Sequence, residues 1–260
     1  MKPDYKNWFP KGMIIGFWVG AVVCVALALI TGFKIDGTIG MILAAILWLG
    51  VIVLVVAGIW GIKMHNAFSY DGDRKMSAQI IEDIAEYVKL PKGGKGLDVG
   101  CGSGALAIAV AKRNSNAGII GIDRWGKDYA SFSMNLCESN AKAEGVSNTS
   151  FKKGDALKLE FPDETFDAVF SNYVYHNIPS KDRQAILLET LRTLKKGGTF
   201  ALHDIFSKEK YGNMEAFLET LKILGYEEMH LLDTTEGIFM TPKEAKWMML
   251  SGSALLYGKK

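Results

Sequence analysis

The sequence predicts an α/β domain that follows two membrane-spanning helices, and three observations lead to this prediction. Residues 13–33 and 37–62 are long apolar runs without a charge. Residues 96–113, GLDVGCGSGALAIAVAKR, read as a buried strand, a glycine-rich loop and a helix. Strand and helix patterns then alternate to residue 260, which is typical of a largely parallel sheet with crossover helices.

The composition outside the apolar runs is that of a folded, formally neutral domain. The chain has 30 Lys and Arg and 28 Asp and Glu, and residues 1–62 hold only four lysines and two aspartates. A neutral remainder argues against a nucleic-acid partner bound through bulk charge. The three cysteines form no CxxC motif or Cys/His cluster, so we expect a reduced, cytosolic environment and no metal site.

The two apolar runs form the predicted membrane anchor, residues 1–62. A helix rises about 1.5 Å per residue and a hydrocarbon core is about 30 Å thick, so each run is long enough to span a bilayer. The link at residues 34–36 is very short. This favours a helical hairpin with both ends on one side of the bilayer. A cleaved signal peptide is disfavoured, because the first run is too long and a second span follows at once.

Basic residues set the expected orientation of this hairpin. Three lysines precede the first span, and Lys63, Arg74 and Lys75 follow the second. The link between the spans has only one lysine and one aspartate. The positive-inside rule then places both termini and the α/β domain in the cytoplasm, as parts of an integral membrane protein.

Small residues mark one face of the first helix. Gly12, Gly16 and Gly20 repeat every fourth residue, and small faces let membrane helices approach closely. The face is typical of a homodimer interface. The alternative is packing against the chain's own second helix, and the sequence leaves both interpretations open.

A polar connector, residues 63–75, leads to the α/β domain, residues 76–260, with its glycine-rich loop. Gly100 and Gly102 permit backbone angles closed to other residues and let the main chain approach a ligand. Gly104 opens a helix whose free amides carry partial positive charge. By itself, this loop fits both a dinucleotide such as NAD and S-adenosylmethionine (SAM).

The elements downstream of the loop are needed to choose between NAD and SAM as the cofactor. A second strand ends in Asp123, a third ends near Asp155, and a fourth ends near Asn172. A helix over residues 181–198 is expected to stop at its two final glycines, before a fifth strand over residues 199–206. A further helix and two strands complete the expected domain.

Residues 70–260 resemble class I SAM-dependent methyltransferases. The matching elements are, in order, Asp98-x-Gly100-x-Gly102-x-Gly104, Asp123, Gly154-Asp155-Ala156, FDAVFSN at 166–172 and LKKGGTFAL at 194–202. The chain is most similar to the small-molecule branch that includes ubiquinone/menaquinone-type C-methyltransferases. The resemblance implies a Rossmann-like seven-stranded sheet with an antiparallel last strand, helices on both faces, and a site at the carboxyl ends of the strands.

The resemblance also implies which residues would hold SAM. Asp98 would orient the methionine part, Asp123 would bind the ribose, and Asp155 would accept a hydrogen bond from adenine. Arg124 or Trp125 would pack against the adenine ring. The cofactor-binding candidates are Tyr70, Asp98, Gly100, Cys101, Gly102, Gly104, Asp123, Arg124, Trp125, Asp155, Ala156 and Asn172. Tyr70 is included because the segment before the core often folds over SAM in this family.

Methyl transfer needs a base only when the acceptor loses a proton. His176, after the fourth strand, is the candidate base, and the alternative is a hydrogen bond to the following loop. The acceptor-binding candidates, each with a packing role as the alternative, are Tyr173, Tyr175, His203 and Trp247. Trp247 lies in an apolar segment, residues 234–252, expected to contact membrane or acceptor or to pack on the sheet edge.

The sequence therefore favours a membrane-anchored enzyme that uses SAM, releases S-adenosylhomocysteine and methylates a small lipophilic acceptor at the lipid bilayer. One alternative is a membrane protein that binds SAM as a sensor or scaffold without turnover. A second is an NAD-dependent membrane oxidoreductase.

Overall fold

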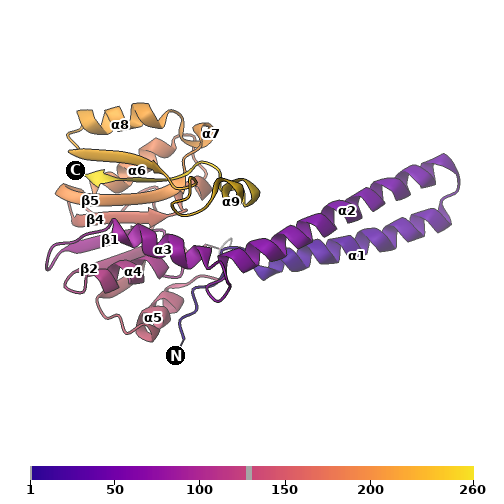
Figure 1. Cartoon of the computed structure of the whole chain (residues 1–260), viewed down its shortest axis with the longest axis horizontal. Coiled ribbons are helices and arrows are strands. Elements are labelled where there is room, and N and C mark those ends of the chain that lie inside the picture. Colours follow the sequence, from indigo (N-terminus) through magenta and orange to yellow (C-terminus); the bar gives the residue numbers. More distant parts are fainter. Residues whose placement is uncertain (1, 127–130) are drawn as a thin grey trace. The chain divides into compact units, whose positions relative to one another are not determined.

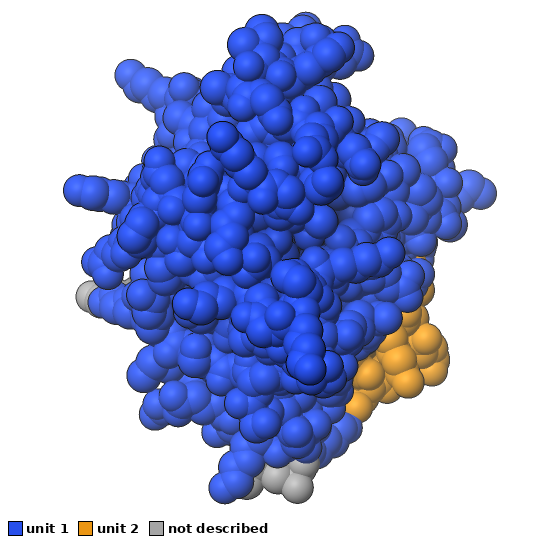
Figure 2. Space-filling view, turned by 90° about the vertical axis from the view of Figure 1, so that its left-hand side faces the viewer, with its two compact units in different colours: residues 1–6, 78–260 blue, residues 7–77 orange. Residues whose placement is uncertain are grey.

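The computed structural model describes residues 2–126 and 131–260. The chain divides into two compact units (Figure 2). Unit 1 comprises residues 1–6 and 78–260, and unit 2 comprises residues 7–77. Residues 2–6 thus belong to the unit that contains the sheet, whereas residues 7–10, which lead into the first helix, belong to unit 2.

Unit 2 is a pair of long apolar helices, α1 (Lys11–Lys34) and α2 (Gly37–Phe68). Their most apolar windows have mean hydropathies of 2.7 and 3.0, so by length and composition both are candidate membrane spans. Helix α2 continues six residues past Ile62, into the segment expected to be a polar connector. The helix continues because residues 63–68 contain no glycine or proline that would stop it.

Glycines of α2 lie close to side chains of α1 and of the segment just before it. A Cβ at Gly58 would lie 2.9 Å from the Trp18 ring, and one at Gly61 would lie 3.2 Å from Ile14 and Phe9 side chains. Among the predicted glycines of α1, only Gly20 has such a neighbour, with Leu54 at 3.2 Å. The space beside Gly12 and Gly16 is open within the described chain. Large α1 side chains packed on α2 glycines therefore hold this pair together.

Unit 1 is built on a seven-stranded sheet of order β3-β2-β1-β4-β5-β7-β6 (Figure 1). The strands are β1 (Lys95–Val99), β2 (Gly118–Asp123), β3 (Thr149–Lys153), β4 (Phe166–Asn172), β5 (Leu194–Ile205), β6 (Glu228–Asp233) and β7 (Ser253–Lys259). Strand β7 is antiparallel to both neighbours, and the other described pairings are parallel. The fold class predicted from the sequence is confirmed. The carboxyl ends of β1, β2, β4 and β5 consequently meet at one edge.

Helices cover the sheet. They are α3 (Met76–Glu86), α4 (Ala105–Arg113), α5 (Met134–Ala143), α6 (Arg183–Arg192), α7 (Lys208–Tyr211), α8 (Met214–Ile223) and α9 (Pro242–Trp247), with a 3-10 turn, η2 (Tyr175–Asn177). Helix α4 packs against β1, β2 and β3, whereas α6 packs against β5 and α8 against β6. Helix α9 begins with the predicted cap, in which Thr241 and Glu244 exchange side-chain and backbone hydrogen bonds.

One predicted element boundary is wrong. Helix α6 ends at Arg192 instead of continuing to Gly198, and Leu194 already pairs with Phe166 as the start of β5. The Thr193 hydroxyl donates to the carbonyl of Thr190 and closes the last turn. Leu194 is fully buried, so the chain turns here to place an apolar side chain in the core.

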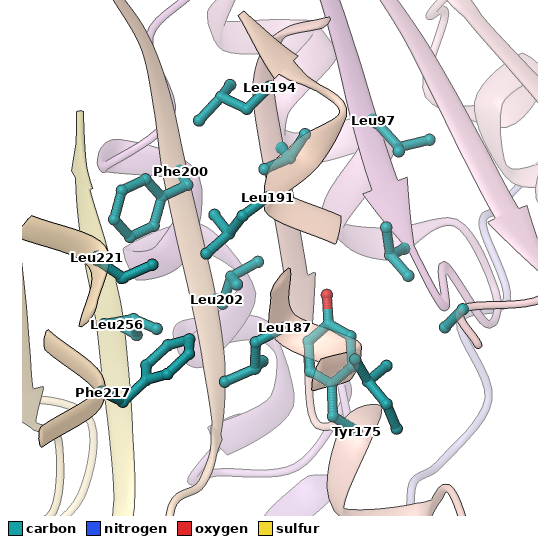
Figure 3. Packing of buried hydrophobic residues seen from close by; sticks show 14 of the residues in the cluster. Leu97, Tyr175, Leu187, Leu191, Leu194, Phe200, Leu202, Phe217, Leu221 and Leu256 are labelled. Atoms are coloured by element: carbon teal, nitrogen blue, oxygen red, sulfur yellow. The ribbon is translucent and has the colours of Figure 1, made fainter. Parts of the chain in front are cut away.

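The main core lies between the sheet and helices α6 and α8. Figure 3 shows leucines of α6 and α8 meeting apolar side chains of β1, β5 and β7. Tyr175 from η2 belongs to this core and is fully buried. The rim that follows β4 is therefore anchored by an aromatic side chain that points into the interior.

Candidate functional site

The loop between β1 and α4 has the left-handed backbone that its glycines were expected to permit. The φ angles of Gly100, Gly102 and Gly104 are +74°, +56° and +81°. Residues with a Cβ adopt such angles at a cost. The amides of Gly100 and Cys101 both donate to the Ile122 carbonyl, at 2.8 and 2.9 Å. The loop is thus fixed against the end of β2.

These glycines serve different purposes. A Cβ at Gly100 would lie 2.3 Å from Val174 Cγ2, and one at Gly104 would lie 3.1 Å from the Phe151 ring. A Cβ at Gly102 would meet nothing closer than Phe132, at 3.8 Å. Gly100 and Gly104 therefore permit close packing, whereas Gly102 leaves space beside the main chain that a side chain would fill. This arrangement fits a ligand lying against Gly102.

Asp98 is buried directly beneath this loop, with 1 % of its surface exposed. Its Oδ2 accepts a hydrogen bond of 3.0 Å from the Ala107 amide in the first turn of α4. Burial raises the pKa of the Asp98 carboxyl to about 8, against the opposing effect of the Ala107 amide. A buried acid with this pKa favours a cationic group as its neighbour.

Asp123, at the end of β2, ties its strand to the glycine loop. Its Oδ2 accepts from the Gly102 amide at 2.9 Å, and its Oδ1 accepts from the Trp125 amide at 2.7 Å. The Trp125 indole NH then donates to the Gly102 carbonyl at 2.9 Å. The indole of Trp125 lies against the loop itself. Sequence reasoning missed this contact, because the pattern carries no signal for where a tryptophan after Asp123 turns.

The next rim residues follow the ends of β2 and β3. The Arg124 Nε lies 3.9 Å from Asp155 Oδ2, and Asp155 Oδ1 accepts from the Leu157 amide at 3.0 Å. Ala156 is buried beside them. The structure therefore brings Arg124, Asp155 and Ala156 together at the edge where the sequence predicted an adenine site.

Cys101 contributes its backbone to the loop while its thiol is buried. Only 7 % of the residue is exposed, and burial, with the neighbouring Cys137, raises the pKa of the thiol. The described cysteines are all free thiols. In residues 2–126 and 131–260, no group of three or more His, Cys, Asp or Glu is placed to hold a metal ion.

At the ends of β4 and β5, a buried polar chain supports the rim. The His203 Nδ1 lies 2.8 Å from Asn172 Oδ1, and its Nε2 lies 3.0 Å from Thr234 Oγ1. Burial lowers the pKa of His203 to about 3, so this imidazole is neutral. His203 is fully buried and both ring nitrogens are engaged. It can act on an acceptor only through the residues that it holds.

His176 occupies a different position, in the turn η2. Its Nδ1 lies 2.6 Å from Oδ1 of Asp204, and 14 % of its side chain is exposed. Asp204 is fully buried at the end of β5, and its Oδ2 also accepts from the amides of Tyr175 and His176. A carboxylate bound to Nδ1 keeps the proton there and leaves the Nε2 lone pair available as a base.

The remaining acceptor candidates divide by burial. Tyr173 packs between the two histidines, with ring centroids 5.9 Å from His176 and 4.6 Å from His203, and its hydroxyl lies 2.8 Å from Ser253 Oγ. Tyr175 instead points into the core, where its hydroxyl meets Thr190 (Figure 3). The structure thus brings Tyr173 to the rim and assigns Tyr175 a packing role.

Two predicted site residues lie farther along the chain. Tyr70 belongs to unit 2, in the turn after α2, so its expected contact with SAM stays a prediction. Trp247 is the last residue of α9 and is 39 % exposed. Its segment also contributes Phe239, which is fully buried with its ring centroid 5.2 Å from that of His203.

Known proteins resemble this chain in sequence and in fold. The family described as a methyltransferase domain matches residues 90–249. The sterol 24-C-methyltransferase of Aspergillus fumigatus is 30 % identical over 157 residues, covering 59 % of this chain and 40 % of that protein. The demethylmenaquinone methyltransferase of Bacillus subtilis is 30 % identical over 162 residues, covering 62 % of this chain and 65 % of that protein. The chain thus spans about half the length of these two relatives.

The solved structure of the (4+2)-cyclase SpnF has the same fold. It matches 72 % of this chain and 82 % of its own length, with a TM-score of 0.55 and 21 % sequence identity. At this identity, the likeness concerns the arrangement of strands and helices alone. The chemistry performed on the fold depends on the residues at the carboxyl edge of the sheet.

Proposed function

The chain belongs to the family of methyltransferase domains, and from this premise we propose that it methylates a small lipophilic acceptor at a membrane. Its cofactor is SAM, which supplies an activated methyl group and is released as S-adenosylhomocysteine. The chain's own residues bind and orient the two reactants and accept a proton. The observation that carries the proposed methylation of a protic acceptor is the pairing of His176 with Asp204.

For the cofactor, the open side of Gly102 would admit the ligand, and Asp98 would face its positive charge. Asp123, whose carboxylate oxygens now accept from the amides of Gly102 and Trp125, would accept from ribose hydroxyls. Arg124 and Asp155 would border the adenine. These roles are proposals that the geometry supports.

On the acceptor side of the site, Val174 lies between the glycine loop and the candidate base His176. It touches the space beside Gly100 and lies two residues before His176. We infer that His176 Nε2 takes the proton that a hydroxyl or an activated carbon acid loses as its oxygen or carbon bonds to the methyl group. Asp204 holds the imidazole for this task and stabilises the imidazolium that results.

The acceptor class follows from the apolar parts of the chain. Helices α1 and α2 are candidate spans that would restrict the enzyme to a bilayer surface. The sterol and menaquinone methyltransferases are named for lipophilic substrates, which agrees with an acceptor in the lipid phase. Residues 1–6 and 78–260 form one unit, which supports a hairpin whose ends lie on one side, the cytoplasmic side by its charges.

The test uses membranes that contain the full chain and methyl-labelled SAM. We expect label in the organic-extractable fraction, and its absence from membranes with the Asp98→Ala/Asp123→Ala double variant, which would not bind SAM. Label confined to the aqueous or protein fraction would contradict a lipophilic acceptor. SAM binding without label in any fraction would favour a sensor or scaffold instead of an enzyme.

A further inference from the structure

We infer that residues 2–6, which precede α1, act as a strap that positions the glycine loop for SAM, and that Asn140 of α5 is the residue that connects them. This strap lies in unit 1 with the sheet, not in the helical hairpin that follows it in sequence. The inference rests on SAM as the cofactor and is independent of the acceptor.

The strap is bound through its backbone. The Asp4 amide donates to Asn140 Oδ1 at 2.7 Å, and Asn140 Nδ2 donates back to the Asp4 carbonyl at 3.1 Å. The carboxamide therefore pairs with both backbone groups of one residue, as a neighbouring strand would. One residue further on, the Tyr5 hydroxyl donates to Glu144 Oε1 at 3.0 Å. Glu144 in turn forms an ion pair with Lys112 of α4.

The same carboxamide reaches the cofactor loop. Asn140 Nδ2 also donates to the carbonyl of Ser103 at 3.0 Å, between Gly102 and Gly104. One helical turn earlier, the Cys137 thiol donates to the Gly102 carbonyl at 3.2 Å. Two side chains of α5 thus hold successive carbonyls of the loop, and one of them also holds the strap.

We infer that the contacts of Asn140 with the strap and with the loop form and break together. With the strap docked, Asn140 is only 2 % exposed, and its carboxamide is hydrogen-bonded to protein groups. Its Oδ1 accepts from the Asp4 amide, and its two N–H groups serve Asp4 and Ser103. Undocking the strap would remove both backbone partners that Asp4 supplies to this carboxamide. Asn140 would then reorient, and the loop carbonyl would lose a donor.

Asn148 provides a matched comparison within the same unit. It holds the carbonyls of Ala111, Asn114 and Ala117 at 2.8–3.2 Å, at the far end of α4 from the cofactor loop. Removing either carboxamide deprives buried or half-buried carbonyls of a donor. Only Asn140 connects to the glycine loop, so only its loss should change cofactor affinity beyond a general effect on stability.

The experiment measures SAM and S-adenosylhomocysteine affinity by calorimetry for the full chain in lipid nanodiscs. Asp4→Pro removes the amide that donates to Asn140, and Asp4→Ala is its control because it keeps that amide. Asn140→Ala is controlled by Asn148→Ala. We expect Asp4→Pro and Asn140→Ala to weaken binding about three- to tenfold, and both controls to stay within about twofold. Wild-type affinity in Asp4→Pro, or equal weakening by Asn148→Ala, would overturn the inference.

A second measurement tests the coupling from the other direction, because linkage between two sites is reciprocal. Saturating SAM should slow hydrogen exchange in a peptide that covers residues 2–8 of the wild type. The effect should disappear in Asn140→Ala at a SAM concentration that still saturates the site. Unchanged exchange in a wild type that binds SAM would refute the strap and leave the proposed function intact. A wild type that binds no SAM would refute both.

Discussion

At the scale of single residues, the buried carboxyl of Asp98 links stability to pH, and we propose that it also contributes to cofactor binding. In the unfolded chain, its carboxyl ionises near the ordinary value of 3.8, whereas in the folded protein the pKa is about 8. Between pH 3.8 and about pH 8, the native state therefore binds more protons than the unfolded state. The free energy of unfolding therefore falls as pH rises through this window.

We predict that the SAM-free protein loses stability as the pH rises towards the folded-state pKa of about 8, and that Asp98→Asn removes most of this slope. The amide oxygen of asparagine can still accept from Ala107 but carries no charge to desolvate. The measurement is denaturant unfolding across pH for the two proteins. At pH 8, the variant should be at least as stable as wild type and yet bind cationic SAM more weakly. Equal slopes in the two proteins would contradict the raised pKa.

His176 and Asp204 supply a second residue-scale prediction. His176→Asn keeps a side-chain N–H near the position of Nδ1, where Asp204 accepts it, but has no counterpart of Nε2. If Nε2 is the base, turnover of a protic acceptor should fall about 100-fold or more, and SAM affinity should not change. Single-turnover kinetics beside a SAM titration measure both quantities. Retained turnover would show that methyl transfer needs no proton removal by this side chain.

At the scale of elements, the glycine loop and the segment after β4 are packed as one piece. Gly100→Ala introduces a Cβ that would lie 2.3 Å from Val174 Cγ2, at a φ of +74°. We expect a loss of about 1–3 kcal/mol in the free energy of unfolding. Val174→Ala in the same chain should recover part of this loss. The part that is not recovered is the cost of the left-handed backbone angle at residue 100.

A double-mutant cycle measures this contact. Gly102→Ala is the comparison, because its Cβ has no neighbour closer than 3.8 Å. It should cost less stability than Gly100→Ala and still weaken SAM binding, since it fills the proposed ligand space. Additive effects of Gly100→Ala and Val174→Ala would mean that the loop and the β4 segment are not in contact.

How far the sequence predicts these elements depends on whether the signal is local. The glycine loop and the cap of α9 were predictable because the backbone angles and capping atoms belong to neighbouring residues. The end of α6 was not, because Leu194 leaves the helix to fill a core made by distant segments. The contact of Asp204 with His176 is also long-range. Both residues lie near the carboxyl ends of neighbouring strands, but the sequence alone could not predict the 2.6 Å distance between their side chains.

At the scale of the whole molecule, the proposed lipophilic acceptor would need a route to the rim. The segment between β6 and β7 starts and ends at the carboxyl edge of the sheet, where the proposed site lies. It exposes Ile238, Trp247 and Met249 by 41 %, 39 % and 74 %. Apolar side chains exposed at one edge suit contact with lipid in a chain that also carries two candidate spans.

The chain offers a matched control at the opposite edge. Ile223, at the end of α8 and before the amino end of β6, is 85 % exposed. If the acceptor enters from lipid beside α9, Met249→Glu should lower kcat/KM for an acceptor embedded in vesicles about tenfold, and Ile223→Glu should not. Both variants should turn over a short-chain, water-soluble form of the acceptor at wild-type rate, because both side chains are largely exposed. An equal loss with the soluble form would indicate damage to the site itself. Wild-type kinetics of Met249→Glu on vesicles would mean that the acceptor arrives by another route and that the exposed apolar groups near α9 do not contact lipid during catalysis.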